Sequence, residues 1–191
     1  MIVIAGPNGS GKSTTAPELL HGALGVTEFV NADTIARGLS AFEPEGVALA
    51  AGRIMLARIK ELAAARERFA FETTLASRSF APWIQELLKT GCSFHLVYLW
   101  LPTPDLSVAR VAERVRRGGH NVPEETIRRR YVAGLRNFFS LYQPLATTWR
   151  VYDNENVLAL IASGRGMRVT RVTDEDQWQK ILHQSASTVE G

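Results

Sequence analysis

The sequence is poor in cysteine and has no long apolar segment. Its 191 residues include one cysteine, Cys92, so no disulfide can form within the chain, in agreement with a reducing compartment. It contains no run of about 18 apolar residues of the kind that spans a membrane. The chain also starts directly with an apolar strand-like segment instead of a basic region and a signal sequence. We therefore expect a cytoplasmic protein without membrane association.

A large net charge, internal repeats and low-complexity tracts are missing as well. The formal net charge is only +3, which does not by itself indicate a nucleic-acid partner, and no stripe of interleaved basic and aromatic residues is present. The 46% apolar content is enough for one domain with a sizeable core. We expect a single domain over residues 1–184, followed by a loose tail over residues 185–191.

The most informative segment present is GPNGSGKS at residues 6–13, between the apolar segment 2–5 and a helical run at 14–20. The spacing G-x-x-x-x-G-K-S is that of a phosphate-binding loop, or Walker A motif, whose backbone N–H groups and helix N-terminus bind phosphates. Lys12 would reach the β- and γ-phosphates, and the Ser13 hydroxyl would ligate Mg²⁺. The alternative is a glycine-rich loop that caps an ordinary helix, but the strand and helix on either side favour nucleotide binding. The residues expected to contact ATP are Gly6, Pro7, Asn8, Gly9, Ser10, Gly11, Lys12, Ser13 and Thr14.

Apolar segments typical of strands alternate with amphipathic segments typical of helices, which predicts an α/β fold with a central parallel sheet flanked by helices. The expected strands cover residues 2–5, 28–32, 68–71, 93–101, 149–152, 157–163 and 167–172, the last two as a hairpin or late strands. The expected helices cover residues 14–20, 44–66, 79–90, 105–117, 123–145 and 174–183. In such a sheet the carboxyl ends of the strands share one edge, where ligands bind. This edge should bring together the phosphate loop, Asp33, Glu72 and Asp153–Asn154.

Two carboxylates follow predicted strands at this edge. Asp33 is placed to orient an attacking alcohol or accept its proton, or else to cap the helix that follows. Glu72 could position Mg²⁺ through water or bind an acceptor, or be an ordinary surface carboxylate. The hydroxyls of Thr73 and Thr74 face the same cleft in this arrangement.

Eight arginines are concentrated between residues 110 and 136, against three glutamates. The two helices and the glycine-containing hinge of residues 105–145 have the character of a lid that closes on ATP and brings guanidinium groups to the transferred phosphoryl group. A solvated basic helix face is the alternative. Arg114 and Arg117, one helical turn apart, are the predicted catalytic arginines, with one of Arg128–Arg130 in addition, and His120 in the hinge is a candidate substrate contact.

Four segments, residues 6–14, 31–36, 72–78 and 117–123, together resemble the zeta-toxin-like P-loop kinases in their small form. The resemblance covers most of residues 1–153. It implies a P-loop NTPase fold of the small-molecule kinase type, ATP and Mg²⁺ as cofactors, and phosphorylation of a hydroxyl on an acceptor such as UDP-N-acetylglucosamine. By position it makes Lys12 and Ser13 the phosphate and metal ligands and Asp33 the catalytic carboxylate. An antitoxin protein becomes a candidate partner.

The leading interpretation is an ATP-dependent kinase that phosphorylates a hydroxyl of a small metabolite, with a nucleotide sugar among the candidate acceptors. A polynucleotide 5′-hydroxyl kinase is a second interpretation, which the arginine-rich segment would serve and the modest net charge opposes. The third is a nucleotide-dependent binding switch, in which ATP orders the lid and no acceptor is phosphorylated.

Overall fold

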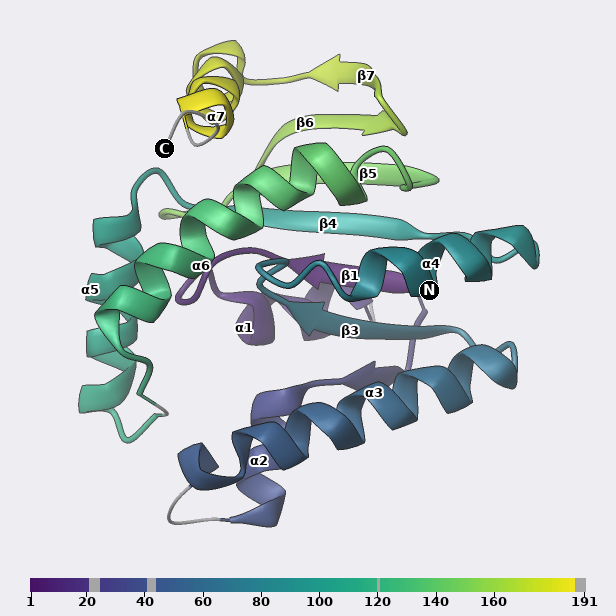
Figure 1. Ribbon diagram of the computed structural model, residues 1–191. Helices are drawn as coiled ribbons and strands as arrows, with labels where there is room; N and C mark the ends of the chain where they lie inside the picture. Colours follow the sequence, from purple (N-terminus) through teal and green to yellow (C-terminus); the bar gives the residue numbers. More distant parts are fainter. Residues whose placement is uncertain (21–24, 41–43, 120, 188–191) are drawn as a thin grey trace.

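The computed structural model describes residues 1–20, 25–40, 44–119 and 121–187. Seven strands form one sheet in the order β2-β3-β1-β4-β5-β6-β7 (Figure 1). The strands are β1 (Ile2–Ala5), β2 (Glu28–Val30), β3 (Phe69–Thr73), β4 (His95–Trp100), β5 (Thr148–Asp153), β6 (Ala159–Arg165) and β7 (Arg168–Val172). β1 to β5 pair in parallel, and β6 and β7 extend the sheet as an antiparallel hairpin. The expected parallel sheet and the late hairpin are both confirmed.

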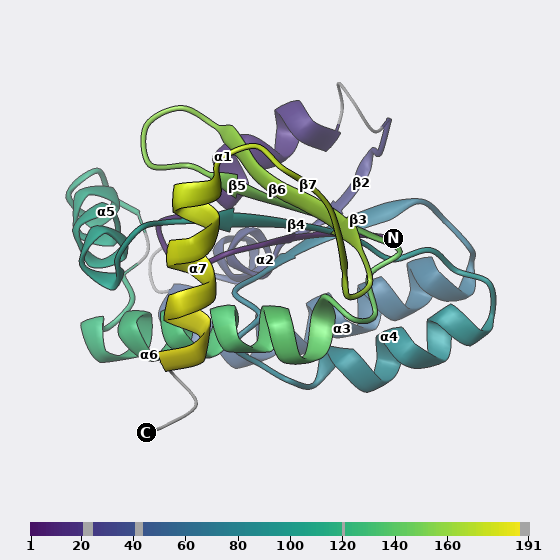
Figure 2. The same cartoon turned by 90° about the horizontal axis from the view of Figure 1, so that it is seen from above.

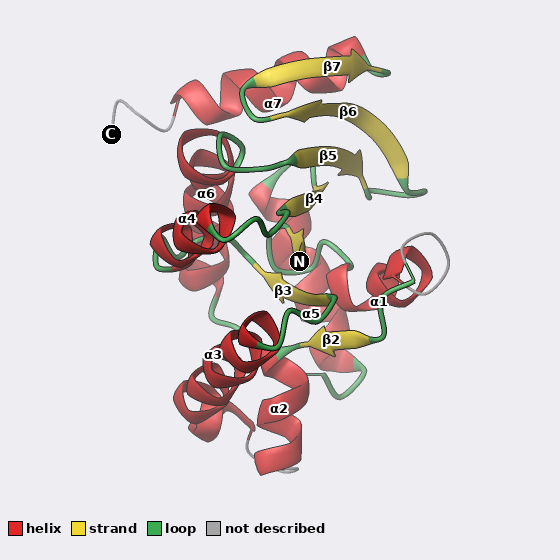
Figure 3. Cartoon of the chain, turned by 90° about the vertical axis from the view of Figure 1, so that its right-hand side faces the viewer, coloured by secondary structure: helices red, strands yellow, loops and turns green. Residues whose placement is uncertain are grey.

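The helices are distributed unequally over the two faces of the sheet. They are α1 (Lys12–Pro17), α2 (Ala32–Leu39), α3 (Ala48–Ala64), α4 (Phe80–Lys89), α5 (Pro104–Arg116), α6 (Glu124–Asn137) and α7 (Glu175–Ser187). Figures 2 and 3 show α3, α4 and α6 on one face and α1 on the opposite face. α5 lies beyond the carboxyl ends of the parallel strands, at the left of Figure 1. No helix in the described ranges is long and apolar enough to cross a membrane.

Strand β1 is buried on both sides because its side chains alternate between two apolar clusters. Val3 and Ala5 belong to the large cluster with residues of α3, α4, α6 and α7. Ile2 and Ile4 belong to a smaller cluster with Ala16 of α1. A strand with buried residues on both faces is typical of the centre of a parallel sheet. The segment that follows β1 is therefore held at the middle of the carboxyl edge.

Several boundaries differ from those expected from the sequence. A 3₁₀ turn, Pro44–Val47, precedes α3, so the helix predicted over residues 44–66 is shorter. The helix predicted over residues 123–145 ends as α6 at Asn137 and continues as a π-helical turn, Phe138–Tyr142, a short irregularity that the helical spacing of apolar residues does not reveal. α7 continues to Ser187, three residues into the predicted tail, and residues 188–191 lie outside the described ranges.

Helix α6 is part of the core. Its Tyr131 and Leu135 are buried, and the Tyr131 hydroxyl donates to the carbonyl of Leu101 at 2.7 Å. Asn137 is also buried, and its Nδ2 donates to the carbonyl of Leu75 at 2.8 Å. Gly134 lies so close to the loop after β3 that an added Cβ would be 2.3 Å from the carbonyl oxygen of Thr74. α6 therefore supports the loop that follows Glu72.

We predict that Gly134→Ala destabilises the protein by about 1–3 kcal/mol, because a methyl group cannot fit against the backbone of Thr74 without moving the loop or the helix. Gly52→Ala in α3 is the matched control, since an added Cβ there meets nothing within 4 Å. Alanine at that helical position should raise stability by about 0.5–1 kcal/mol. Denaturant unfolding of both variants checks this, and equal effects would contradict the close approach of α6 to Thr74.

Candidate functional site

A cleft of about 740 Å³ lies at the carboxyl edge of the sheet, between the phosphate loop, α2, the end of β3, α5 and α6. Its walls include most of the residues predicted from the sequence: Asn8, Gly9, Gly11, Lys12, Ser13, Thr14, Asp33, Glu72, Thr73, Thr74, Arg114 and Arg117. Gly6, Pro7 and Ser10 are buried and do not line the cleft. His120 lies outside the described residues. Segments far apart in the sequence thus meet as the parallel topology requires.

The phosphate loop has the backbone shape that its glycines allow. Gly11, the residue before α1, has φ 82°, a left-handed conformation that residues with a Cβ adopt only with strain. Lys12 is buried, and its Nζ donates to the carbonyls of Gly6 at 3.0 Å and Pro7 at 2.8 Å. Burial lowers the pKa of Lys12, and the nearby carboxylates of Glu72 and Asp33 oppose this shift. The loop therefore holds a desolvated cation directly beside the cleft.

The hydroxyl of Ser13 connects the phosphate loop to β3 and α2. Its Oγ donates to Glu72 Oε2 at 2.8 Å and accepts from Asn31 Nδ2 at 3.3 Å. Burial raises the pKa of Glu72, with the Lys12 charge acting in the opposite direction. These are oxygen donors of the type that Mg²⁺ prefers, and Mg²⁺ commonly takes only one or two protein ligands besides substrate phosphates. The described residues contain no group of three His, Cys, Asp or Glu that could enclose a metal by themselves.

Asp33 occupies the first turn of α2, not the end of β2. The residue that caps α2 is Asn31, whose Oδ1 accepts from the backbone N–H of Thr34 at 3.0 Å. The capping alternative for Asp33 is therefore wrong, because the helix starts before it. Asn31 was missed as a site residue, although asparagine is among the preferred capping residues and was a visible signal. Its single side chain holds both the start of α2 and the Ser13 hydroxyl.

Five arginines line the cleft, and the four that come from the arginine-rich segment differ in how they are bound. Arg114 and Arg110 come from α5, and Arg130 comes from α6. Arg130 is half-buried, and desolvation lowers its pKa. Arg117 is exposed, and its Nε is 2.9 Å from Glu113 Oε1. Of the three candidates Arg128–Arg130, only Arg130 reaches the cleft.

Arg128 instead pairs with Asp105 at 2.6 Å and with Glu124 at 2.8 Å, on the outside of the two helices. Arg116 also pairs with Glu113 and does not line the cleft. Part of the basic segment is therefore a solvated face of paired charges, as the alternative interpretation of the sequence had it.

Apolar side chains on the wall opposite α5 were not identified from the sequence. Met55 of α3 is buried and Phe80 of α4 is half-buried, and both line the cleft. The exposed Arg37 of α2 lies on the same wall. This half of the cleft combines apolar surface with charge beside Asp33, an arrangement that fits an organic molecule bearing polar groups.

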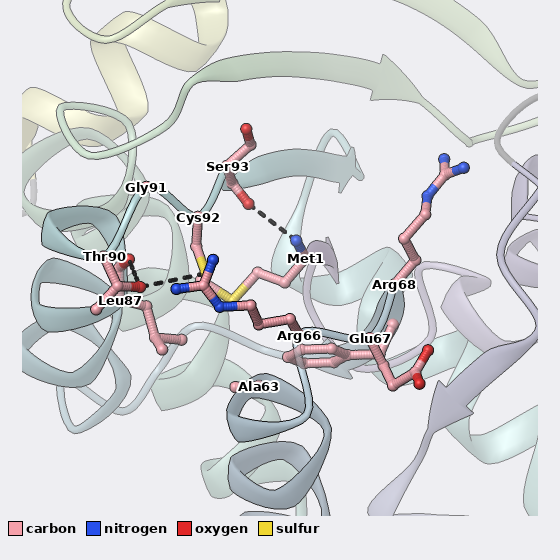
Figure 4. A pocket seen from close by; sticks show the side chains of 11 residues that line it. Met1, Ala63, Arg66, Glu67, Arg68, Leu87, Thr90, Gly91, Cys92 and Ser93 are labelled. Carbon is pink, nitrogen blue, oxygen red and sulfur yellow. Dashed lines mark hydrogen bonds between the residues drawn. The ribbon is translucent and has the colours of Figure 1, made fainter.

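A second hollow, of about 250 Å³, lies at the opposite edge of the sheet (Figure 4). It is lined by residues at the starts of β1, β3 and β4, and the Arg66 side chain extends across it toward Thr90. The amino group of Met1 donates there to the carbonyl of Ser93 at 2.8 Å. None of the predicted site residues lies in this hollow.

Comparison with protein families and known proteins agrees with this geometry. A family model described as an AAA domain matches residues 1–132. A protein of Haemophilus influenzae, described as an uncharacterized protein, is 28% identical over 130 residues, which make up 68% of this chain and 91% of that protein.

The solved structures that resemble this chain share its fold at low identity. A chain of the AvrRxo1-ORF1:-ORF2 complex with ATP matches with a TM-score of 0.75 at 18% identity, over 94% of this chain and 62% of that chain. A chain of the PezAT chromosomal toxin–antitoxin system of Streptococcus pneumoniae matches with a TM-score of 0.62 at 13% identity, over 100% of this chain and 88% of that chain. A gluconokinase from Sinorhizobium meliloti matches with a TM-score of 0.51 at 17% identity, over 99% of this chain and 93% of that chain.

This chain thus spans less than two thirds of the AvrRxo1 chain that it matches. The expected P-loop fold of the small-molecule kinase type is confirmed, and the resemblance to the zeta-toxin-like proteins is confirmed at the level of the fold.

The raised pKa of Glu72 gives a prediction for stability. Because the folded-state pKa lies above the ordinary value of 4.5, ionisation of Glu72 removes stability as the pH rises from 4.5 through the folded-state value. Glutamine keeps an oxygen to accept from Ser13 but has no charge to desolvate. Glu72→Gln should therefore raise the melting temperature of the ligand-free protein at neutral pH, and the gain should vanish as the pH falls to about 4.5.

Thermal unfolding over a pH series measures this difference, with Glu67→Gln as the control because Glu67 is exposed. A Glu72→Gln variant less stable than the parent at neutral pH would show that the carboxylate stabilises the fold through its neighbours.

Proposed function

The chain belongs to the AAA domain family of P-loop proteins, and from this premise we propose that it is an ATP-dependent phosphotransferase that phosphorylates a hydroxyl of a small metabolite. The observation that carries the proposal is the convergence of a phosphate loop, a carboxylate on the acceptor side and lid arginines on one cleft. A protein that only bound nucleotide would need no carboxylate at this position for chemistry.

The residues of the phosphate loop fit ATP and Mg²⁺. The buried Lys12 ammonium and the loop N–H groups would bind the phosphates, and Ser13 with Glu72 would hold the metal directly or through water. When bound, Mg²⁺ neutralises charge on the phosphate oxygens. The pairing of Ser13 with a carboxylate, in place of a backbone group, is what supports a cation at this position.

Asp33 would act on the acceptor. Its carboxylate lies in the cleft beside the phosphate loop, where it can orient a hydroxyl and take its proton as the new O–P bond forms and the bond to the leaving ADP breaks. Arg114 and Arg130, on the facing helices, are placed to stabilise negative charge on the transferred group. Thr73, Thr74 and the wall of Met55 and Phe80 would contact the acceptor.

The acceptor that we propose is an organic molecule with polar groups, and a nucleotide sugar such as UDP-N-acetylglucosamine fits this description. A polynucleotide receives less support, because Arg116, Arg117 and Arg128 are paired with carboxylates and offer less positive charge to phosphodiesters. A cytoplasmic location and an antitoxin partner belong to the same proposal.

The proposed lid is shorter than residues 105–145. The burial of Tyr131, Leu135 and Asn137 makes most of α6 a fixed wall, so that closure would involve the tip between α5 and α6.

The phosphorylated product would be identified by incubating the protein with γ-labelled ATP and a panel of nucleotide sugars, nucleosides and oligonucleotides. Label transfer only to oligonucleotides, or ATP binding without transfer to any acceptor, would contradict the proposal.

The role of Asp33 separates a kinase from a binding switch. Asp33→Asn removes the charge and leaves the cap of α2 intact, since Asn31 provides it. We expect nearly unchanged affinity for ATP–Mg²⁺ and phosphoryl transfer reduced by about 10²-fold or more. Calorimetry and single-turnover transfer measure the two effects. Asn31→Ala is the contrasting variant and should lower stability by about 1 kcal/mol through loss of the cap. Transfer by Asp33→Asn at the parental rate would leave the mechanism without its base.

The two predicted arginines of α5 should differ in effect. Arg114 is half-buried at the cleft, whereas Arg117 is exposed and bound to Glu113. We expect Arg114→Ala to lower kcat more than it weakens ATP binding, and Arg117→Ala to have the smaller effect on kcat. Steady-state kinetics at saturating ATP checks this order, and equal small effects would assign both side chains to a solvated face.

A further inference from the structure

Two carbonyl groups of the phosphate loop, those of Gly9 and Ser10, are bound by side chains from distant segments. Arg110 of α5 donates from Nη1 to the carbonyls of Gly9 at 3.3 Å and Asn154 at 2.8 Å, and from Nη2 to the carbonyl of Glu155. Asn154, directly after β5, donates from Nδ2 to the carbonyl of Ser10 at 2.7 Å. We propose that Arg110 and Asn154, the carbonyl clamp, are positioning residues that hold the phosphate loop in its nucleotide-binding form, an inference that rests on the proposed nucleotide binding.

The peptide plane explains how the clamp acts on nucleotide binding. Because the peptide unit is planar, fixing a carbonyl oxygen also fixes the direction of the N–H of the next residue. The bond from Asn154 to the Ser10 carbonyl therefore sets the direction of the Gly11 N–H, at the start of α1. The bond from Arg110 to the Gly9 carbonyl sets the direction of the Ser10 N–H. This N–H donates to the carbonyl of Pro7 at 3.2 Å within the loop.

The glycines of the loop fit against the same clamp. A Cβ on Gly11 would be 2.6 Å from Asn154 Nδ2, and a Cβ on Gly9 would be 2.9 Å from the Ser107 carbonyl and 3.0 Å from Arg110 Cβ. Two glycines expected for phosphate contacts are therefore also required by the backbone and side-chain atoms packed around the loop. The loop has no room to shift toward α5 or toward the turn after β5.

Arg110 is suited to this role by its shape. Its planar fork reaches carbonyls of the phosphate loop and of the β5–β6 connection at once, which a lysine ammonium at the end of a flexible stem cannot reproduce. Its three acceptors are all backbone oxygens, so the guanidinium orders the backbone instead of compensating a carboxylate. It also fixes α5 to the loop, one helical turn from Arg114. Arg110 thus positions the phosphate loop and the helix that carries a proposed catalytic arginine.

The test uses ADP as the probe and needs no acceptor. Arg110→Lys and Asn154→Ala are compared with Arg116→Lys, a control in the same helix whose side chain pairs with Glu113 and does not line the cleft. We expect each clamp variant to weaken ADP binding by about tenfold, because a loop that samples other shapes reduces apparent affinity by the competent fraction. Hydrogen exchange of the Gly11 and Ser10 amides should speed up in the ADP-free clamp variants and stay at the parental rate in the control.

The double variant distinguishes a shared role from two separate ones. If both side chains hold the same loop, the combined loss of ADP affinity should be smaller than the product of the single losses. Arg110→Lys and Asn154→Ala are tested separately. If one variant does not fold, as judged by the loss of cooperative unfolding, the other variant still tests the clamp. Parental ADP affinity and parental amide exchange in the clamp variants would overturn the inference.

The outcomes also separate this inference from the proposed function. A parent protein that binds ADP but phosphorylates no acceptor would contradict the kinase proposal and leave the clamp measurable. A parent protein that transfers phosphate, with clamp variants that bind ADP as it does, would overturn the clamp alone. No ADP binding by the parent would overturn both.

Discussion

The register of the central parallel strands determines where Glu72 and Thr73 lie relative to the phosphate loop. Ile4 of β1 is paired with Glu72 of β3, and Ala5 is paired with Thr73 and Tyr98. A strand shifted by one residue would turn its buried side chains to the other face, so the apolar clusters on both faces fix this register. Glu72 therefore ends beside the phosphate loop, within 2.8 Å of Ser13 Oγ. By fixing the strand pairing, the core thus sets the distance between Glu72 and Ser13, the two residues of the proposed metal site.

The cleft also concentrates charge where burial makes charge unfavourable. Desolvation lowers the pKa of Lys12 and raises that of Glu72, and each of these groups counteracts the shift of the other. In the free protein, Lys12 compensates by donating to two carbonyls of its own loop. A bound polyphosphate would offer this ammonium fully charged phosphate oxygens in place of the partial charges on the two carbonyl oxygens. The site is thus arranged for an anionic ligand before one arrives.

The fold could largely be predicted from the sequence because apolar periodicity and a P-loop motif both act locally. The parallel strands and the late hairpin were found in this way, and most of the predicted site residues line the cleft. Asn31 was missed because both it and Asp33 are common capping residues, and only the start of α2 decides between them. The clamp was missed for another reason: the parallel topology brings Asn154 to the phosphate loop, but its bond to Ser10, 144 positions away, depends on side-chain geometry that no local pattern carries. Arg130 could not be separated from Arg128 until the crossing of α5 and α6 was known.

The support of the loop after β3 by α6 limits how far this side of the cleft can change in evolution. Leu75, in a left-handed conformation with φ 56°, is buried, and Asn137 binds its carbonyl. Substitutions here would disturb packing and the site together, so this side of the cleft is constrained by stability. The opposite wall carries the exposed Arg37 and Ala48, which contribute little to the core. Single substitutions there can change the lining of the cleft and leave the packing of the core unaffected.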